Sequence, residues 1–213
     1  RFRLAPTLVA PENGQLARIV ARLERRADDV DERRGVHESQ IDSLPRQGVD
    51  GIGRINRSLL KFIRDRNDLQ AGLDLQIAAY YSGLALANAG LGAVHALARP
   101  FGGLFARPYG LACAVLLPYI SKLNRSSNVV KYAVTGRALG ADSSFSDEKT
   151  ADFCVTRIAA LNASLAIPSD FKRYGISREH IAKIVEDGQG SSLKNNPADL
   201  TRAQLSDLLE RLF

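Results

Sequence analysis

Residues 88–119 read Asn-Ala-Gly-Leu-Gly-Ala-Val-His-Ala-Leu-Ala-Arg-Pro-Phe-Gly-Gly-Leu-Phe-Ala-Arg-Pro-Tyr-Gly-Leu-Ala-Cys-Ala-Val-Leu-Leu-Pro-Tyr. Small and apolar residues fill both halves of this stretch, and Arg107-Pro108-Tyr109-Gly110 interrupts them. Proline and glycine close together mark a break, whereas long apolar runs without strand-like alternation favour helix. We therefore expect one helix over about 91–105 and a second over about 111–123, packed closely through small residues.

The rest of the chain also favours helices. Alanine and leucine dominate its composition and are good helix formers, and no segment alternates convincingly as a strand would. Further helices are expected over 14–34, 51–66, 69–87, 129–139, 148–165, 178–187 and, after Thr201, to the last residues. Residues 1–13 read as an extended arm and 35–50 as irregular. The sequence predicts an all-α fold in which the helix over 69–87, apolar on most faces, is central.

Composition and charge exclude some partners. The formal net charge is +6, but basic residues alternate with acidic ones, as in Arg22-Leu23-Glu24-Arg25, a pattern typical of a solvated helix face. No apolar run approaches the roughly 20 residues of a membrane span. We expect neither nucleic-acid binding nor a transmembrane segment. With 213 residues, we divide the chain into an N-terminal arm and charged helix, 1–50, and a helical domain, 51–213.

Two blocks of the sequence carry a family resemblance. Residues 74–119 resemble the metal-site helix pair of the iron-containing (group III) alcohol dehydrogenases, and residues 165–213 resemble the closing segment of that family, including Leu193-Lys194-Asn195-Asn196-Pro197. The resemblance implies the family's C-terminal helical domain, which is dehydroquinate synthase-like. The family's Rossmann-type nucleotide domain is not matched here, because Gly90-Leu91-Gly92 lies between helices rather than after a strand.

The resemblance also implies a metal site, and the ligands of the family can be compared position by position with this sequence. Family members hold Fe(II) or Zn(II) through one aspartate and three histidines and use NAD(P) as hydride carrier. Of two histidines fourteen residues apart, the first is His95 here and the second is replaced by Tyr109, while a further family histidine is replaced by Arg99. The weakly matched upstream segment, 14–18, offers neither of the other ligands. The site is therefore expected to be degenerate, with no cofactor bound to this chain.

Alternatives remain for the residues of this site. His95 fits a remnant ligand, and it also fits a buried histidine whose nitrogens are satisfied within an apolar helix. Arg99, Arg107 and Tyr109 fit side chains that fill a vacated polar cavity and pair with acids. The same three residues also fit an anion or substrate pocket, because arginine binds carboxylate and phosphate with two parallel hydrogen bonds.

Three functions follow, and the presence of enzyme activity stays open. The first is a non-catalytic, structural domain, a pseudoenzyme subunit of a larger assembly. The alternative is the helical part of an NAD(P)-dependent alcohol dehydrogenase whose nucleotide-binding domain lies outside this chain, and the third is a small-anion module. A protein partner is expected in either of the first two cases, since apolar faces such as that of residues 69–87 need cover. Cys113 and Cys154 read as buried thiols, which indicates a reducing compartment, the cytoplasm or the mitochondrial matrix.

Overall fold

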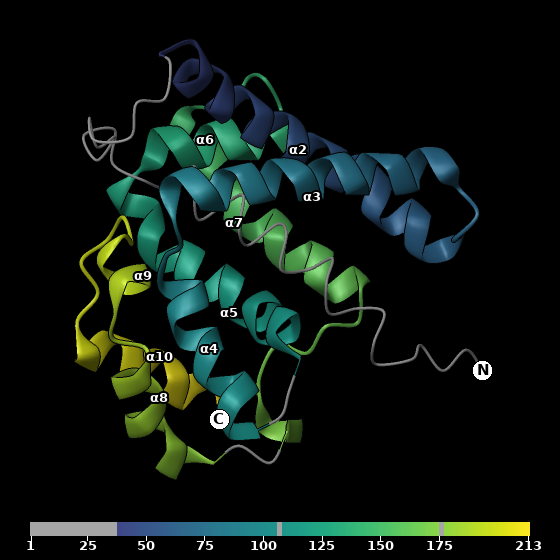
Figure 1. Ribbon diagram of the computed structural model, residues 1–213. Helices are drawn as coiled ribbons and strands as arrows, with labels where there is room; N and C mark the ends of the chain where they lie inside the picture. The colour runs from purple at the N-terminus through teal and green to yellow at the C-terminus, as the bar shows by residue number, and fades with distance from the viewer. Residues whose placement is uncertain (1–37, 106–107, 175–176) are drawn as a thin grey trace.

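The computed structural model describes residues 38–105, 108–174 and 177–213 (Figure 1). No strand occurs in these ranges, so the prediction of an all-α fold is confirmed. The helices are α2 (Glu38–Arg64), α3 (Leu69–Ala89), α4 (Ala93–Phe105), α5 (Tyr109–Asn124), α6 (Val129–Ala138), α7 (Asp147–Ser164), α8 (Ile181–Asp187), α9 (Ser191–Lys194) and α10 (Arg202–Leu212), with short 3-10 turns at Arg125–Ser127, Lys172–Tyr174 and Arg178–His180. The helix predicted over 14–34 lies outside the described residues.

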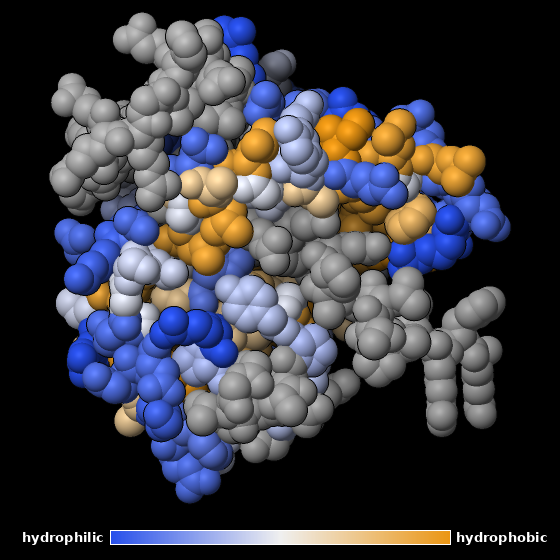
Figure 2. All heavy atoms as spheres, in the orientation of Figure 1, coloured by the Kyte–Doolittle hydropathy of each residue, from blue (hydrophilic) through white to orange (hydrophobic). Residues whose placement is uncertain are grey.

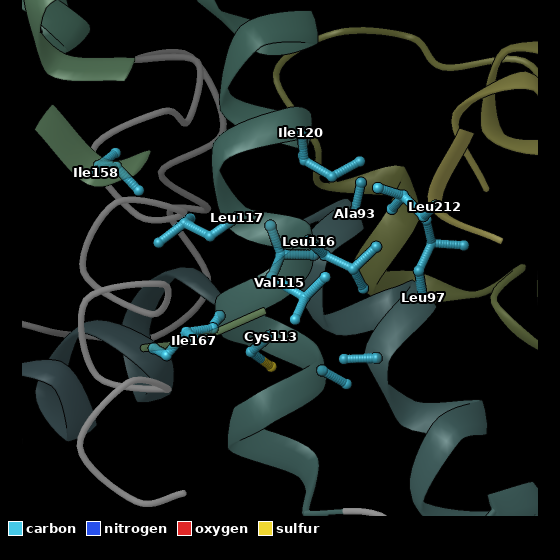
Figure 3. Close-up of a cluster of buried hydrophobic side chains, with 14 of the residues drawn as sticks. Ala93, Leu97, Cys113, Val115, Leu116, Leu117, Ile120, Ile158, Ile167 and Leu212 are labelled. Atoms are coloured by element: carbon cyan, nitrogen blue, oxygen red, sulfur yellow. The ribbon is translucent and has the colours of Figure 1, made fainter. Parts of the chain in front are cut away.

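Helix α5 is the centre of the hydrophobic core. Figure 3 shows Leu117 on one side of α5 lying toward Ile158 of α7, and Leu116 on another side lying toward Leu97 of α4 and Leu212 of α10. All five of these side chains are almost completely buried. An apolar sequence on every face is what such a position requires, so the stretch 111–123 folds as the sequence predicts but takes the central place expected for residues 69–87.

Helix α3 packs on one face only, and its expected central position is wrong. It lies beside α2 at the top of Figure 1 and buries mostly small residues there, including Ala71, Ala78 and Ala85. Its opposite face exposes Leu69, Leu73 and Tyr80, and Figure 2 shows apolar residues gathered along this helix. Small residues let two helices approach closely, so α3 needs only a narrow stripe to pack on α2.

A membrane-spanning helix is not found among residues 38–105, 108–174 and 177–213. Only α3 taken together with the first part of α4, Ala93–Phe101, has the necessary length and composition, and these two segments meet at 104°.

Helix α2 corrects the expectation of an irregular segment over 35–50, as far as residues 38–50 are concerned. The helix begins at Glu38 and continues through Pro45 and Gly48, although proline and glycine disfavour a helix interior. Gly48 and Gly51 are both buried, and α2 packs along α3 and against α6. These tertiary contacts outweigh the local cost of proline and glycine in a helix. The boundary placed between residues 50 and 51 falls inside this continuous helix.

The C-terminal helices close the core beside α4 (Figure 1). Thr201 caps α10 in a capping box with Gln204, and the apolar face formed by Leu205, Leu208, Leu209 and Leu212 is buried. The helix expected over 178–187 is present as a 3-10 turn followed by α8. The rings of Phe101, Phe171 and Phe213 form a triangle, with Phe171 4.3 Å from Phe101 and 5.7 Å from Phe213 between ring centroids, which ties α4 to the end of the chain.

Candidate functional site

The start of α4 is held in place by a buried amide. The main-chain N–H of Ala93 donates to Oδ1 of Asn196 at 3.1 Å, and the same amide group exchanges two hydrogen bonds with Asn124 at the end of α5. A helix start leaves N–H groups without partners inside the helix, and this contact satisfies one of them. The arrangement fixes α4 against α5 two residues before His95.

His95, Tyr109 and Cys113 form one cluster between α4 and α5. Nδ1 of His95 lies 2.8 Å from Oη of Tyr109 and 3.3 Å from Sγ of Cys113. The histidine and tyrosine rings are nearly parallel, with centroids 5.8 Å apart and planes inclined by 20°. The structure therefore brings together the two positions that the sequence resemblance paired, fourteen residues apart.

Burial differs among the three side chains of this cluster. His95 is 2% exposed and Cys113 is 0% exposed, whereas Tyr109, at the first position of α5, is only half-buried. A polar side chain that is closed off from water needs a hydrogen-bond partner within the protein, and Tyr109 supplies one for Nδ1 of His95. Tyr109 is the member of the cluster that an outside molecule can approach.

Cys113 is the member of the site that sequence reasoning missed. The sequence predicts a buried thiol here, and the structure confirms the burial and adds the contact with the imidazole of His95. The missed signal is its spacing: Cys113 follows Tyr109 by four residues, and side chains four apart lie on the same face of a helix.

Of the two arginines predicted for this site, the structure describes only Arg99. Arg99 is exposed, and its guanidinium donates to the main-chain carbonyl of Asp187, the last residue of α8, at 2.8 Å. A cation at a helix C-terminus is favourable because carbonyl groups there carry partial negative charge. Arg107 lies outside the described residues. The convergence of Arg99, Arg107 and Tyr109 on an anion stays a prediction.

A second polar cluster lies between α2 and α3. The buried carboxylate of Asp74 accepts hydrogen bonds from Arg57 Nε at 2.9 Å, Arg54 Nη1 at 2.7 Å and Ser58 Oγ at 2.6 Å. The hydrogen bond from Arg57 lowers the pKa of Asp74, with Ser58 and the positive charges adding to the effect and burial opposing it. This group joins the two helices and is fully occupied with its partners, so it is structural.

The donor atoms at His95 do not fit the iron or zinc ion that the family resemblance implies. Two ligands of a tetrahedral ion with bonds of about 2.0 Å lie roughly 3.3 Å apart, whereas the nitrogen and phenol oxygen here are at hydrogen-bond distance. No group of three or more His, Cys, Asp or Glu side chains suited to a metal occurs in the part of the chain that the structure describes. The local match for the two upstream ligands falls outside it.

Comparison with known proteins assigns the sequence to a family. A model described as the C-terminal part of the Fe-containing alcohol dehydrogenase family matches residues 42–213. The chain belongs to that family, and the described helices are those of its C-terminal domain, as the resemblance predicted.

Individual alcohol dehydrogenases are also similar to this chain in sequence. The chain is 36% identical over 168 residues to long-chain-alcohol dehydrogenase 1 of Geobacillus thermodenitrificans, covering 78% of this chain and 42% of that protein. It is 30% identical over 164 residues to alcohol dehydrogenase 4 of Saccharomyces cerevisiae, covering 76% and 42%. The chain thus spans less than half the length of these relatives.

Solved structures share the fold. A crystal structure of a 1,3-propanediol oxidoreductase superposes with a TM-score of 0.87 at 23% identity, over 99% of this chain and 53% of the other. An alcohol dehydrogenase from Oenococcus oeni gives 0.85 at 23% identity, over 99% and 52%. At this identity the likeness establishes the all-α fold.

Proposed function

We propose that these residues are the helical part of an NAD(P)-dependent alcohol dehydrogenase, a protein that interconverts an alcohol and a carbonyl compound. The family match and the 36% identity to a long-chain-alcohol dehydrogenase support this. Those relatives are more than twice as long as the matched region, which leaves room for a nucleotide-binding domain elsewhere in the polypeptide. NAD(P) would bind to that domain.

One observation carries the proposal. His95 and Tyr109 are the positions that the resemblance assigns to a pair of metal ligands, and their side chains lie 2.8 Å apart. Burying a polar side chain costs free energy unless it is hydrogen-bonded, so filling buried space alone does not call for polar residues here. Here the site keeps three adjoining polar or ionisable side chains, with Tyr109 reachable from outside.

The open face of α3 supports a further domain or subunit in contact with this one. Leu69 is 84% exposed and Tyr80 is 63% exposed, on a helix whose sequence is strongly apolar. A contiguous exposed apolar surface of this kind usually marks a site where another protein or domain binds. We place the nucleotide-binding domain or a second subunit of the dehydrogenase on this face.

The test is aldehyde-dependent oxidation of NADH or NADPH by the full polypeptide that contains these residues. Straight-chain aldehydes of increasing length probe the carbonyl substrate. The change in NAD(P)H fluorescence on binding to the protein measures coenzyme binding independently of turnover. We expect coenzyme binding and aldehyde-dependent turnover. A full polypeptide that binds neither coenzyme and oxidises neither would refute the proposal.

A non-catalytic, structural domain is the second candidate function. The observation that favours it is the donor set of the site, in which a phenol and a thiol accompany the imidazole of His95. In that case the open face of α3 would be covered by a different protein. Native mass spectrometry of the protein purified from its own source separates the two candidates: a homo-oligomer of the full dehydrogenase supports the first, and a metal-free hetero-complex without turnover supports the second.

The compartment remains a proposal. Both cysteines, Cys113 and Cys154, are buried thiols, as expected in a reducing compartment, and we propose the cytoplasm or the mitochondrial matrix. Fractionation of the source cells with an antibody to the protein tests this, and recovery from an oxidising, secreted fraction would contradict it.

A further inference from the structure

We infer that Tyr109, hydrogen-bonded to His95, is the proton donor to the carbonyl oxygen of the substrate, in the place that a metal ion holds in iron-containing relatives. The inference rests on the proposed function, because it concerns the oxygen side of the same reaction. The substrate class is an aldehyde or ketone in one direction and the corresponding alcohol in the other.

Position selects Tyr109 for this role. Its phenol oxygen lies 2.8 Å from Nδ1 of His95, at a position where the family resemblance puts a ligand to the ion that polarises the substrate oxygen. A group that replaces a Lewis acid must stabilise negative charge on that oxygen, and an O–H donor does so by sharing and then transferring its proton. A phenol also needs none of the metal ligands that other residues replace in this chain.

Burial supports the same assignment. Of the three clustered side chains, His95 and Cys113 are closed off from solvent, and Tyr109 is half-buried. A substrate oxygen can therefore approach Tyr109, with His95 behind it. The nearly parallel rings of His95 and Tyr109 hold the phenol oxygen at the imidazole nitrogen, so the proton donor is positioned before the substrate arrives.

The chemical step balances with the coenzyme of the proposed function. Hydride from NAD(P)H forms the new C–H bond at the carbonyl carbon, and the electron pair of the C=O π bond moves to oxygen. That oxygen takes the proton from Oη of Tyr109, giving the alcohol, NAD(P)⁺ and a phenolate. With Nδ1–H donating to Oη, His95 stabilises the phenolate, and Oη of the half-buried Tyr109 then takes its proton back from solvent. Oxidation of the alcohol runs through the same transfers in reverse.

Cys113 offers an alternative interpretation of the cluster, namely a metal site. A thiolate and an imidazole together favour a borderline or soft ion such as Zn(II), and Sγ lies 3.3 Å from Nδ1 of His95. Under our inference Cys113 supports the imidazole ring and binds no metal. Replacing Cys113 therefore distinguishes the two chemistries.

The experiment compares variants of the full polypeptide by turnover with NAD(P)H and an aldehyde, and by iron and zinc content from elemental mass spectrometry. We expect the unmodified protein to hold far less than one iron or zinc per chain and to keep its rate in a chelator. Tyr109→Phe should lower kcat by about 100-fold or more, the usual contribution of a general acid, with coenzyme affinity unchanged. The matched control is Tyr119→Phe on the same helix, where the phenol donates to the carbonyl of Ser169, and we expect its kcat within about twofold of the unmodified value.

Two further variants complete the test. His95→Gln should lower kcat and change its pH profile, because the phenolate loses the imidazole N–H that stabilises it, while Cys113→Ser should leave metal content and most of the rate unchanged. Circular dichroism and thermal unfolding show whether each variant is folded.

The outcomes separate the inference from the proposed function. Full activity in folded Tyr109→Phe overturns the inference and leaves the dehydrogenase proposal standing. So does one metal ion per chain together with loss of activity in a chelator, and loss of that metal in Cys113→Ser would assign the cluster as its site. Absence of turnover and of coenzyme binding in the unmodified protein overturns both.

Discussion

Asn124 and Asn196 face each other across the core as a reciprocal pair of amides, although 72 residues separate them in the chain. Asn124 Nδ2 donates to Asn196 Oδ1 at 2.9 Å, and Asn196 Nδ2 donates to Asn124 Oδ1 at 2.7 Å. Asn196 also accepts from the N–H of Ala93 and donates to the carbonyl of Ala198. One amide therefore joins the start of α4, the end of α5 and the segment before α10.

Replacing either amide should destabilise the protein. Asn196→Ala leaves a buried N–H of Ala93 and the Asn124 amide without this partner, and each unsatisfied polar group costs about 1–3 kcal/mol. In urea unfolding we expect Asn124→Ala and Asn196→Ala each to lose roughly 2–4 kcal/mol. The double variant should lose much less than the sum, as residues in contact do. Additive losses would show that the pair is not coupled.

The cluster at Asp74 predicts a loss of stability in acid. The folded-state pKa of Asp74 is lowered, first by the hydrogen bond from Arg57, so its contribution is fully present above the unfolded value of about 4. It is lost as the pH falls through the lowered folded-state pKa. We expect Asp74→Asn to cost about 1–3 kcal/mol at pH 7, because a buried acceptor loses its charge while both arginine partners stay partly exposed to solvent. The difference between the two proteins should shrink below about pH 4, measured by urea unfolding across pH, and a pH-independent difference would contradict the assignment.

Two glycines predict opposite effects of the same substitution. A Cβ at Gly136 of α6 would collide with the main-chain carbonyl and the side chain of Thr150 on α7, whereas a Cβ at Gly83 of α3 meets nothing within 4 Å. Gly136→Ala should therefore lower the free energy of unfolding by about 1–3 kcal/mol. Gly83→Ala should raise it by up to about 1 kcal/mol, because alanine favours helix. Equal effects would mean that α6 and α7 are not packed this closely.

The face of α3 makes a prediction about the complete protein. Leu75 is buried in the core, while Leu73 on the same helix is 49% exposed. If the rest of the polypeptide covers α3, Leu73→Ala should destabilise the complete protein by more than 1 kcal/mol, approaching the roughly 2–5 kcal/mol expected for Leu75→Ala. Val130→Ala, at an exposed site on α6, is the control and should stay within about 0.5 kcal/mol. A Leu73→Ala effect as small as that of the control would leave α3 uncovered.

The sequence predicts most helices of this fold because their signals are local. Apolar spacing and the break at Pro108-Tyr109-Gly110 place α4 and α5, and the capping box at Thr201 places α10. The first part of α2 is missed, since Pro45 and Gly48 are unfavourable in isolation and are tolerated only where the helix packs against α3 and α6. The relative burial of α3 and α5 is missed for the same reason: both sequences are apolar, and only tertiary packing separates them.

The candidate site is predicted in part. The fourteen-residue spacing pairs His95 with Tyr109 correctly, because the resemblance carries the geometry of two packed helices. Cys113 and the amide pair of Asn124 and Asn196 are not predicted, since a buried thiol or amide has no sequence pattern that distinguishes a partner from inert packing. The contact of Arg99 with α8 also depends on the tertiary arrangement.

The most direct measurement is the rate of aldehyde-dependent NAD(P)H oxidation by the full polypeptide before and after exhaustive treatment with a chelator. Our account predicts a measurable rate that the chelator leaves unchanged, because the hydroxyl of Tyr109, rather than a metal ion, stabilises the negative charge on the substrate oxygen. A rate that disappears with the chelator and returns with added iron or zinc would contradict it, and so would a complete absence of turnover in both conditions.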